Sequence, residues 1–186
     1  MCGLAGIYSH KPVATELYDS LIHLQHRGQD AAGITTYNKH MHKTKGLGLV
    51  RDIFTEKKIK RLKGNIGIAH TRYPTHGGFG HGEIQPFWTS VPYGIALAHN
   101  GNLTNYNELA KNITSNESRY LNTNSDTEVL LHLFAELLHD KNKHDNDKEF
   151  FDGLCSALEN IYEHVHGAYS VVALVIGKGL VAFRDP

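Results

Sequence analysis

The residue with the clearest chemical potential is Cys2, which directly follows the initiator Met1. Removal of Met1 would leave Cys2 as the N-terminus, with a free α-amine and a thiol on one residue. The unperturbed pKa of an α-amine is about 7.7 to 8.0 and that of a thiol is about 8.5, so near neutral pH the amine can accept the thiol proton. Cys2 could therefore supply both a nucleophile and its base. In isolation, however, a cysteine at this position is more often an incidental small residue.

Two polar segments at the ends of predicted strands could bind a substrate. Arg72 can hold a carboxylate through two parallel charged hydrogen bonds, or it can form an ordinary surface salt bridge. The glycine-rich residues 73–83 after it lack the Lys-Ser/Thr of a nucleotide-binding loop, so we expect a hinged lid over a pocket. In the second segment, the Asn100 amide and the Gly101 N–H could point at one oxygen, although Asn-Gly is also the commonest tight-turn pair.

Two further segments carry charged side chains. Asp126 stands at the start of a predicted helix, where an aspartate normally just caps the helix. A carboxylate held ionised there could also bind a substrate ammonium group. Residues 24–30 surround Arg27 and, considered alone, predict a solvated loop.

The composition limits the kinds of partner. The chain has 186 residues, enough for one domain with a core, and its 19 basic residues equal its 19 acidic ones. No field of one sign therefore favours nucleic acid or a membrane surface. The apolar run at residues 4–8 is too short for a membrane span and follows no basic segment, so we expect no signal peptide. A nucleophilic Cys2 must stay reduced, which favours a cytoplasmic location.

The hydrophobic pattern predicts many strands first and most helices afterwards, which indicates antiparallel sheets flanked by helices and hence an α+β fold. The predicted strands cover residues 3–9, 31–37, 44–50, 65–71, 93–99, 168–176 and 180–184. The predicted helices cover residues 12–25, 55–62, 105–113, 125–139 and 149–164.

Three finer expectations accompany these elements. Ser125 and Glu128 match the capping-box pattern at the start of the fourth helix. Cys155 is expected to face the core from the last helix. Residues 139–148 are charged and rich in asparagine, which predicts a mobile surface loop.

Taken together, the motifs occur in an order that resembles the N-terminal-nucleophile, or class II, glutamine amidotransferase family. The ordered motifs are Met1-Cys2-Gly3, Arg27-Gly28-Gln29-Asp30, His70-Thr71-Arg72, Asn100-Gly101-Asn102 and Ser125-Asp126-Thr127-Glu128. Within the family the chain is most similar to the amidophosphoribosyltransferases, through the segments LQHRGQDAAGI, QPF, PYGIALAHNGNLTN and NSDTE. The resemblance implies that residues 2–186 form one glutaminase domain, a four-layer αββα sandwich with two antiparallel sheets between helices.

The resemblance also implies a role for each matching residue. Cys2 would attack the side-chain amide of glutamine, forming a γ-glutamyl thioester and releasing ammonia, while Asn100 and Gly101 form the oxyanion hole. Arg72 would bind the α-carboxylate of glutamine, and Asp126 would bind its α-ammonium. The remaining implied residues are Arg27, which supports the Cys2 end, and Tyr73, Thr75 and His76, which line the pocket or its lid.

The partners follow from the same resemblance. L-glutamine would be the substrate, and the ammonia would serve phosphoribosylamine synthesis, the first step of purine biosynthesis. We expect a phosphoribosyltransferase domain, which binds phosphoribosyl pyrophosphate with Mg²⁺, to lie outside these 186 residues, and the full-length enzyme to be a homo-oligomer. No metal or cofactor is expected in this chain. Its two cysteines, Cys2 and Cys155, cannot supply the four ligands of the iron–sulfur cluster that some members of the family carry.

Three alternatives stay open at this point. The segment His76-Gly77-Gly78 departs from the amidophosphoribosyltransferase pattern. The continuation Thr75-His76-Gly77 is more like that of the hexosephosphate aminotransferases, whose glutaminase domain is the first alternative. The second is another N-terminal-nucleophile amidohydrolase that acts on a different small amide. The third is a non-catalytic glutamine-sensing module, although sensing alone needs no nucleophile.

Overall fold

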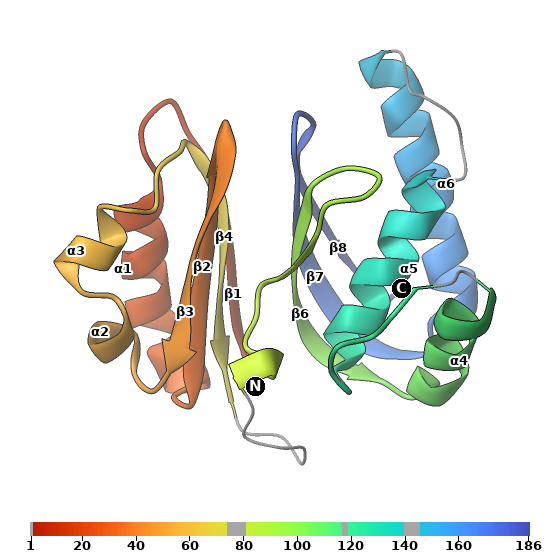
Figure 1. The fold of residues 1–186 in the computed structure, drawn as a ribbon, viewed down its shortest axis with the longest axis horizontal. Helices are drawn as coiled ribbons and strands as arrows, with labels where there is room; N and C mark the ends of the chain where they lie inside the picture. The colour runs from red at the N-terminus through yellow and green to blue at the C-terminus, as the bar shows by residue number, and fades with distance from the viewer. Residues whose placement is uncertain (1, 74–80, 117–118, 140–145) are drawn as a thin grey trace.

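The first sheet carries the N-terminal half of the fold. A computed structural model describes residues 2–73, 81–116, 119–139 and 146–186. The antiparallel strands of this sheet follow the order β1-β4-β2-β3. Their bounds are β1 Gly3–Tyr8, β2 Ala31–Asn38, β3 His40–Leu47 and β4 Ile66–Arg72. Three helices cover its outer face in Figure 1: α1 Ala14–Leu24, α2 Val50–Ile53 and α3 Glu56–Ile59.

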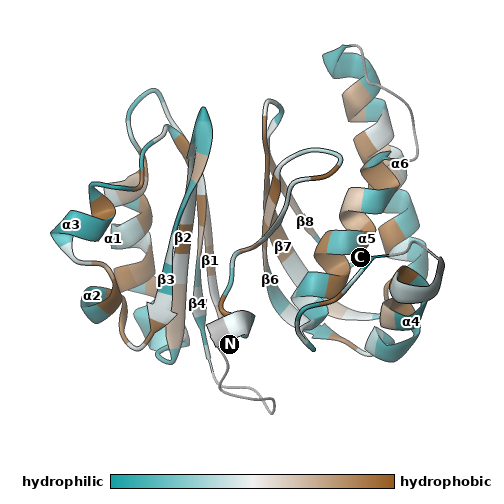
Figure 2. Cartoon of the chain, in the orientation of Figure 1, coloured by the Kyte–Doolittle hydropathy of each residue, from teal (hydrophilic) through white to brown (hydrophobic). Residues whose placement is uncertain are grey.

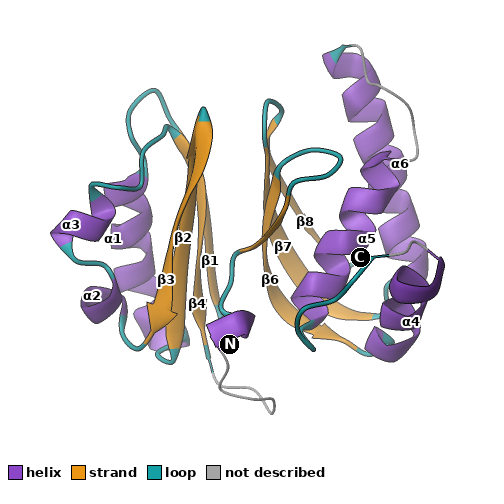
Figure 3. Cartoon of the chain, viewed as in Figure 1, coloured by secondary structure: helices purple, strands orange, loops and turns teal. Residues whose placement is uncertain are grey.

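The second sheet is also antiparallel and follows the order β5-β6-β7-β8. Its strands are β5 Phe87–Thr89, β6 Ile95–Leu103, β7 Gly167–Val175 and β8 Gly179–Arg184. The helices that cover its outer face are α4 Tyr106–Asn116, α5 Asp126–His139 and α6 Asp147–His164. Figure 3 shows the resulting succession of helices, sheet, sheet and helices, which confirms the predicted α+β, four-layer αββα sandwich.

Three hydrophobic clusters hold the layers together, and Figure 2 shows hydrophobic residues along the strands of both sheets. Leu17 and Leu21 of α1 pack on Ile34 of β2 in the outer cluster of the first sheet. The corresponding cluster of the second sheet includes Phe134 of α5 and Leu97 of β6. Burying a side chain of this size contributes about 1.5 to 3 kcal/mol. Hydrophobic packing therefore holds each sheet against the helices on its outer face.

The third cluster lies between the sheets and sets their spacing. Ile68 of β4 packs there with Ala98 of β6 and Leu174 of β7. A Cβ atom at Gly6 of β1 would lie 2.7 Å from Cγ1 of Val172. The sheets thus approach so closely that only a small residue fits at this point, and the ends of β1, β4 and β6 are held at fixed positions relative to one another.

Strand β6 corrects one interpretation of the sequence. Asn100 and Gly101 could have formed a hairpin turn, but they lie within β6 and pair with Ser170 and Tyr169 of β7. Gly101 adopts a φ of 151°, a region that side chains rarely enter. This Asn-Gly pair therefore lies within a strand in which the glycine has a positive φ. Local sequence propensity cannot distinguish such a strand from a turn.

The hydrogen bonds at the start of α5 differ from the predicted capping box. The Ser125 N–H donates to Oγ1 of Thr123 at 3.1 Å. The Glu128 carboxylate accepts from the backbone N–H of Asn122 at 3.0 Å and from that of Thr123 at 2.7 Å. The predicted capping box is thus replaced by a carboxylate that holds the preceding loop. Burial raises the pKa of Glu128, but the hydrogen bonds from Asn122 and Thr123 outweigh it and lower that pKa.

Other differences concern side-chain facing and element length. Cys155 is exposed rather than in the core, because the buried stripe of α6 runs through Leu154, Ala157 and Ile161 and Cys155 lies about 100° around the helix from Leu154.

The strand predicted at residues 44–50 begins earlier, as β3, and ends at Leu47. The predicted helix 55–62 is limited to α3. The short elements α2 and β5 were not predicted, and most of the predicted loop 139–148 lies outside the described residues.

Among the described residues, no helix combines the length and the apolar character needed to cross a membrane.

Candidate active site

A cavity of about 500 Å³ opens where β1, β4, β6 and the start of α5 meet. Residues from distant parts of the sequence line this cavity together. Those predicted to act on the substrate are Cys2, Arg72, Tyr73, Gly101 and Asp126. Those without a predicted role are Glu83, Gln85, His99, Asn102, Leu103, Tyr106, Asn124 and Ser125.

Cys2 lies immediately before β1 and is partly exposed. Its carbonyl oxygen accepts a hydrogen bond from Nε of Arg27 at 3.2 Å and another from Nδ2 of Asn100 at 3.1 Å. The N–H of Gly3 donates to Oγ1 of Thr71 at 3.1 Å. The backbone beside the thiol is thus held from three directions, so the predicted contact between Arg27 and the Cys2 end is present.

Arg72 ends β4 and faces the cavity with its charge paired. Its Nη2 donates to Oε2 of Glu83 at 2.8 Å, and both side chains are mostly buried. The backbone of Arg72 is fixed from behind, because the Asp30 N–H donates to its carbonyl at 3.2 Å. A Cβ atom at Gly28 would lie only 2.6 Å from the carbonyl carbon of Arg72. The segment around Arg27, which alone resembled a solvated loop, therefore supports the Arg72 strand end.

Gly101 needs to be a glycine for two reasons. Its φ of 151° is rare for other residues. A Cβ atom at this position would also lie 2.0 Å from the carbonyl oxygen of Ala168 on β7. Strand β6 therefore lines the cavity at Gly101 with its backbone and without a side chain. The Asn100 side chain is held beside it by the hydrogen bond to Cys2.

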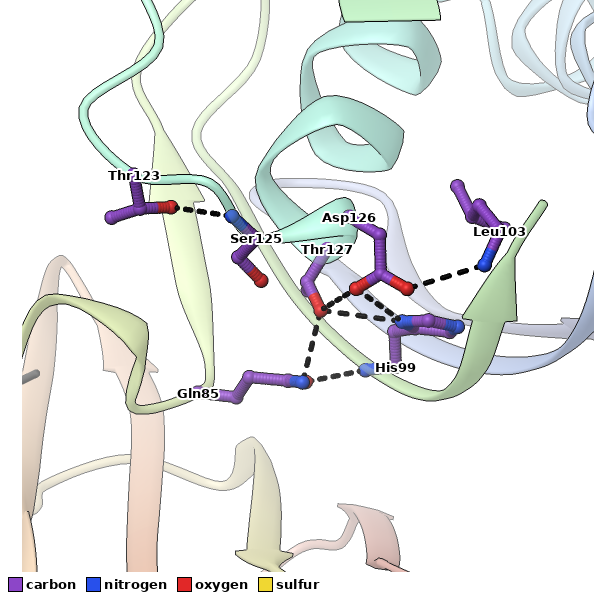
Figure 4. Close-up of polar contacts among 7 residues, drawn as sticks. All are labelled: Gln85, His99, Leu103, Thr123, Ser125, Asp126 and Thr127. Atoms are coloured by element: carbon purple, nitrogen blue, oxygen red, sulfur yellow. Dashed lines mark hydrogen bonds and ion pairs between the residues drawn. The ribbon is translucent and has the colours of Figure 1, made fainter. Parts of the chain in front are cut away.

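Asp126 is the first residue of α5, and Figure 4 shows its carboxylate among polar partners. Oδ2 accepts from the Leu103 N–H at 3.3 Å, and Oδ1 lies 3.6 Å from Nδ1 of His99. Burial raises the pKa of Asp126. The hydrogen bond and charge of His99, with the backbone of Leu103 and Thr127, outweigh that burial and hold the pKa below its usual value. The carboxylate is therefore ionised at neutral pH.

The remaining predicted residues are placed only in part. Tyr73 lines the cavity and is half exposed. Thr75 and His76, with most of the predicted lid, lie outside the described residues.

Three of the cavity residues without a predicted role, Glu83, Gln85 and His99, contact predicted site residues or their neighbours. Gln85 belongs to the QPF segment and His99 to the AHNG segment, so both lay inside noted motifs without an assigned role. Glu83 stood at the end of the glycine-rich run. Their partners are 11 to 42 residues away in sequence, and no local pattern reveals such contacts.

No group of three or more His, Cys, Asp or Glu side chains in the described part of the chain could hold a metal ion. Arg72 supplies a cation and Asp126 an anion to the lining of one cavity that Cys2 also lines. This arrangement can bind a small zwitterion beside a nucleophile.

Comparisons with known proteins agree with this chemistry. A family model described as a glutamine amidotransferase domain matches residues 50–145. The amidophosphoribosyltransferases of Pseudomonas aeruginosa and Escherichia coli are 48% and 47% identical to the chain, and each alignment covers 100% of it. The chain spans 37% of the length of these relatives.

A solved structure shares the fold. The glutamine phosphoribosylpyrophosphate amidotransferase from Bacillus subtilis, complexed with ADP and GMP, matches with a TM-score of 0.77 and 30% identity. The match covers 100% of this chain and 37% of that one. These findings confirm the family that the ordered motifs indicated: the chain belongs to the glutamine amidotransferase domain family.

Proposed function

We propose that this chain is the glutamine-hydrolysing domain of an amidophosphoribosyltransferase. The observation that carries the proposal is the meeting of Cys2, Arg72 and Asp126 around one cavity. Free glutamine is a zwitterion with a carboxylate and an ammonium on one carbon and an amide at the other end. A cation, an anion and a thiol on one cavity match these three groups. A glutamine residue inside a peptide lacks both charges and would be rejected.

The proposed reaction begins once Met1 has been removed. The α-amine of Cys2 accepts the thiol proton, and the sulfur attacks the side-chain amide carbon of glutamine. The Asn100 amide and the Gly101 N–H stabilise the oxyanion, a contribution of about 3 to 4 kcal/mol per donor in comparable sites. The amine then returns the proton to the leaving nitrogen, and ammonia departs. Water hydrolyses the γ-glutamyl thioester to glutamate and regenerates the thiol.

Supporting contacts give the scheme a structural basis. Arg27 and Asn100 both donate to the Cys2 carbonyl, which fixes the backbone that carries the nucleophile. Such fixing keeps the reacting atoms near attack distance and reduces the entropy lost in the reaction. In this scheme Tyr73 lines the glutamine pocket. The same role for Thr75 and His76 stays a prediction, because both lie outside the described residues.

The whole-protein activity is part of the same proposal. The relatives are more than twice as long as this chain and are named amidophosphoribosyltransferases. We infer that ammonia released here is used by a phosphoribosyltransferase domain outside these 186 residues, which binds phosphoribosyl pyrophosphate and Mg²⁺. A homo-oligomeric enzyme in the reducing cytoplasm, where Cys2 stays a thiol, completes the proposal.

The alternatives are less well supported. The full-chain relatives reported above carry the name of the purine enzyme rather than that of a hexosephosphate aminotransferase. A glutamine sensor would need the two charged ligands but no thiol within the same cavity. A different amidohydrolase would not require both a cation and an anion for its substrate.

The test is the release of glutamate and ammonia across a glutamine titration, with and without phosphoribosyl pyrophosphate and Mg²⁺. We expect hydrolysis by the wild-type chain, none by Cys2→Ala, and no effect of phosphoribosyl pyrophosphate. Binding of glutamine without hydrolysis would favour the sensor. Stimulation by phosphoribosyl pyrophosphate would place part of the acceptor site within these residues.

A further inference from the structure

The Gln85 side chain lines the cavity and forms hydrogen bonds to two elements, β6, which carries Asn100 and Gly101, and α5, which begins at Asp126. Its Oε1 accepts from the His99 N–H of β6 at 2.6 Å. Its Nε2 donates to Oγ1 of Thr127 in α5 at 2.9 Å. Figure 4 shows the amide between these two partners. The three residues are 8%, 2% and 0% exposed, respectively, so these bonds are shielded from water.

The backbone of Gln85 is fixed against the other sheet. A Cβ atom at Gly33 of β2 would lie 2.0 Å from the Gln85 carbonyl oxygen and 3.0 Å from Cδ of Pro86. Any larger residue at position 33 would push Gln85 away. The residue is therefore held between the sheets, with its main chain on β2 and its side chain on β6 and α5.

The side chain extends the β-ladder of β6 beyond the end of β5. Strand β5 pairs through Phe87 with Leu97, and His99 lies two residues further along β6. No β5 residue pairs with His99, and the Gln85 amide oxygen accepts its N–H instead. Since Asn100 and Gly101 follow directly, this bond fixes the strand where the proposed oxyanion hole begins.

The same amide determines the direction of the next hydrogen bonds. A backbone N–H can only donate, so the end of the amide that faces His99 must be the oxygen. The Nε2 end must then donate to Thr127, whose hydroxyl oxygen accepts and keeps its own proton for another partner. Oδ1 of Asp126 lies 3.5 Å from that hydroxyl, and a carboxylate can only accept.

His99 completes the arrangement. Its Nδ1 lies 3.2 Å from Oγ1 of Thr127 and 3.6 Å from Oδ1 of Asp126. With the proton on Nδ1, the ring donates toward the same carboxylate oxygen. Gln85, Thr127 and His99 thus form a chain of donors that ends on Asp126.

We propose that Gln85 is a positioning residue that aligns the Asp126 carboxylate for the α-ammonium of the substrate and couples it to the strand carrying Asn100 and Gly101. It acts through His99 and Thr127 and does not itself need to contact the substrate. The inference rests on the proposed glutamine hydrolysis. It adds a residue that determines how strongly the site requires an α-ammonium group.

The test compares two substrates in the 186-residue chain. Glutamine and glutaramate, its analogue without the α-ammonium, are each assayed for ammonia release, and the ratio of their kcat/KM values measures recognition of the ammonium. We expect Gln85→Met, which keeps the size but loses both hydrogen bonds, to lower this ratio about tenfold. A loss of stability alone would reduce both kcat/KM values equally and leave the ratio unchanged.

Two further variants keep the test decisive. Gln85→Glu retains an acceptor for the His99 N–H but, when ionised, cannot donate to Thr127, so the ratio should also fall. Thr127→Val removes the hydroxyl, and its effect should not add to that of Gln85→Met. The matched control is Gln25→Met, which loses two hydrogen bonds of the same kind, to Gly28 and Val50, from a side chain that does not line the cavity. Its ratio should match the wild type.

The outcomes separate the two proposals. Folded Gln85 variants with the wild-type ratio would overturn the role of Gln85 while leaving glutamine hydrolysis intact. Additive effects of Gln85→Met and Thr127→Val on the substrate ratio would also contradict the proposed role of Gln85. A wild-type chain that releases ammonia from neither substrate would overturn the proposed function itself.

Discussion

Arg72 and Glu83 form an ion pair inside the cavity, with Nη2 of the arginine 2.8 Å from Oε2 of the glutamate. The side chains are 14% and 22% exposed, so the contact is largely shielded from solvent. In the proposed reaction Arg72 binds the α-carboxylate of glutamine. The substrate must therefore share Arg72 with a carboxylate of the protein, or displace it.

Removal of this competing carboxylate should strengthen binding. We expect Glu83→Gln to lower the KM for glutamine about fivefold with little change in kcat, because one partly buried charged hydrogen bond no longer has to be replaced. Glu136→Gln is the matched control, since it removes a similar contact to Arg119 at 2.6 Å outside the cavity. A higher KM in Glu83→Gln would show instead that Glu83 orients Arg72 for the substrate.

The proposed roles of the cavity residues predict different kinetic effects. Arg72→Ala and Asp126→Ala should mainly raise KM, because both contacts exist before and during the reaction. Asn100→Ala should lower kcat about 100- to 1000-fold with less change in KM, because the oxyanion forms only in the transition state. It also removes the hydrogen bond to the Cys2 carbonyl. Steady-state kinetics with the reverse pattern would mean that the roles are wrongly assigned.

Gly101 should tolerate no side chain. The φ of 151° and the 2.0 Å approach of Ala168 mean that an added Cβ requires movement of β6 or β7. Gly179→Ala is the matched control, because it has a φ of 129° but nothing within 4 Å of the added Cβ. We expect Gly101→Ala to reduce the free energy of unfolding by at least about 2 kcal/mol more than this control. Urea denaturation measures both, and equal losses would contradict the steric argument.

His70 should make the fold sensitive to acid. Burial, followed by the nearby His99 and Arg72, lowers the pKa of His70 from 6.5 to about 3. As the pH falls below about 6.5, the unfolded chain takes up a proton that the folded chain does not bind until the pH approaches 3. The His70 contribution is therefore complete above pH 6.5 and declines below it, by up to about 1.4 kcal/mol per pH unit.

A comparison of slopes tests this prediction. The free energy of unfolding is measured by urea denaturation between about pH 7 and pH 5 in the wild type and in His70→Leu. The variant should lose stability less steeply as the pH falls, whatever its absolute stability. Identical slopes would mean that His70 titrates alike in the folded and unfolded chains.

The sequence predicted the fold where the pattern was long and periodic. The apolar run of β4 and the helical spacing of α5 and α6 identified those elements, and the order of the predicted elements indicated antiparallel sheets flanked by helices. The four-layer arrangement followed only from the family resemblance. The three residues of β5 were too few to give a pattern. Cys155 was misplaced because one step along a helix turns a side chain from the core to solvent.

The site was predictable where a residue type alone limits the chemistry. A cysteine after Met1, an arginine at a strand end and an aspartate at a helix start each suggest a role. Gln85 and Glu83 could not be identified this way, because their importance depends on contacts with β6, α5 and β4 that only folding creates. The Asn100-Gly101 pair shows the opposite case, in which a strong local signal for a turn is overridden by pairing with β7.

The proposed reaction requires that Cys2, as the N-terminal residue, forms a covalent intermediate with glutamine. Mass spectrometry of the wild-type chain, quenched with acid during turnover, detects this intermediate. We expect a protein that lacks Met1 and carries one γ-glutamyl group, as a thioester, on the peptide that begins with Cys2. The Cys2→Ser variant should carry no thioester. An active protein that retains Met1, or an acyl group attached to another residue, would contradict it.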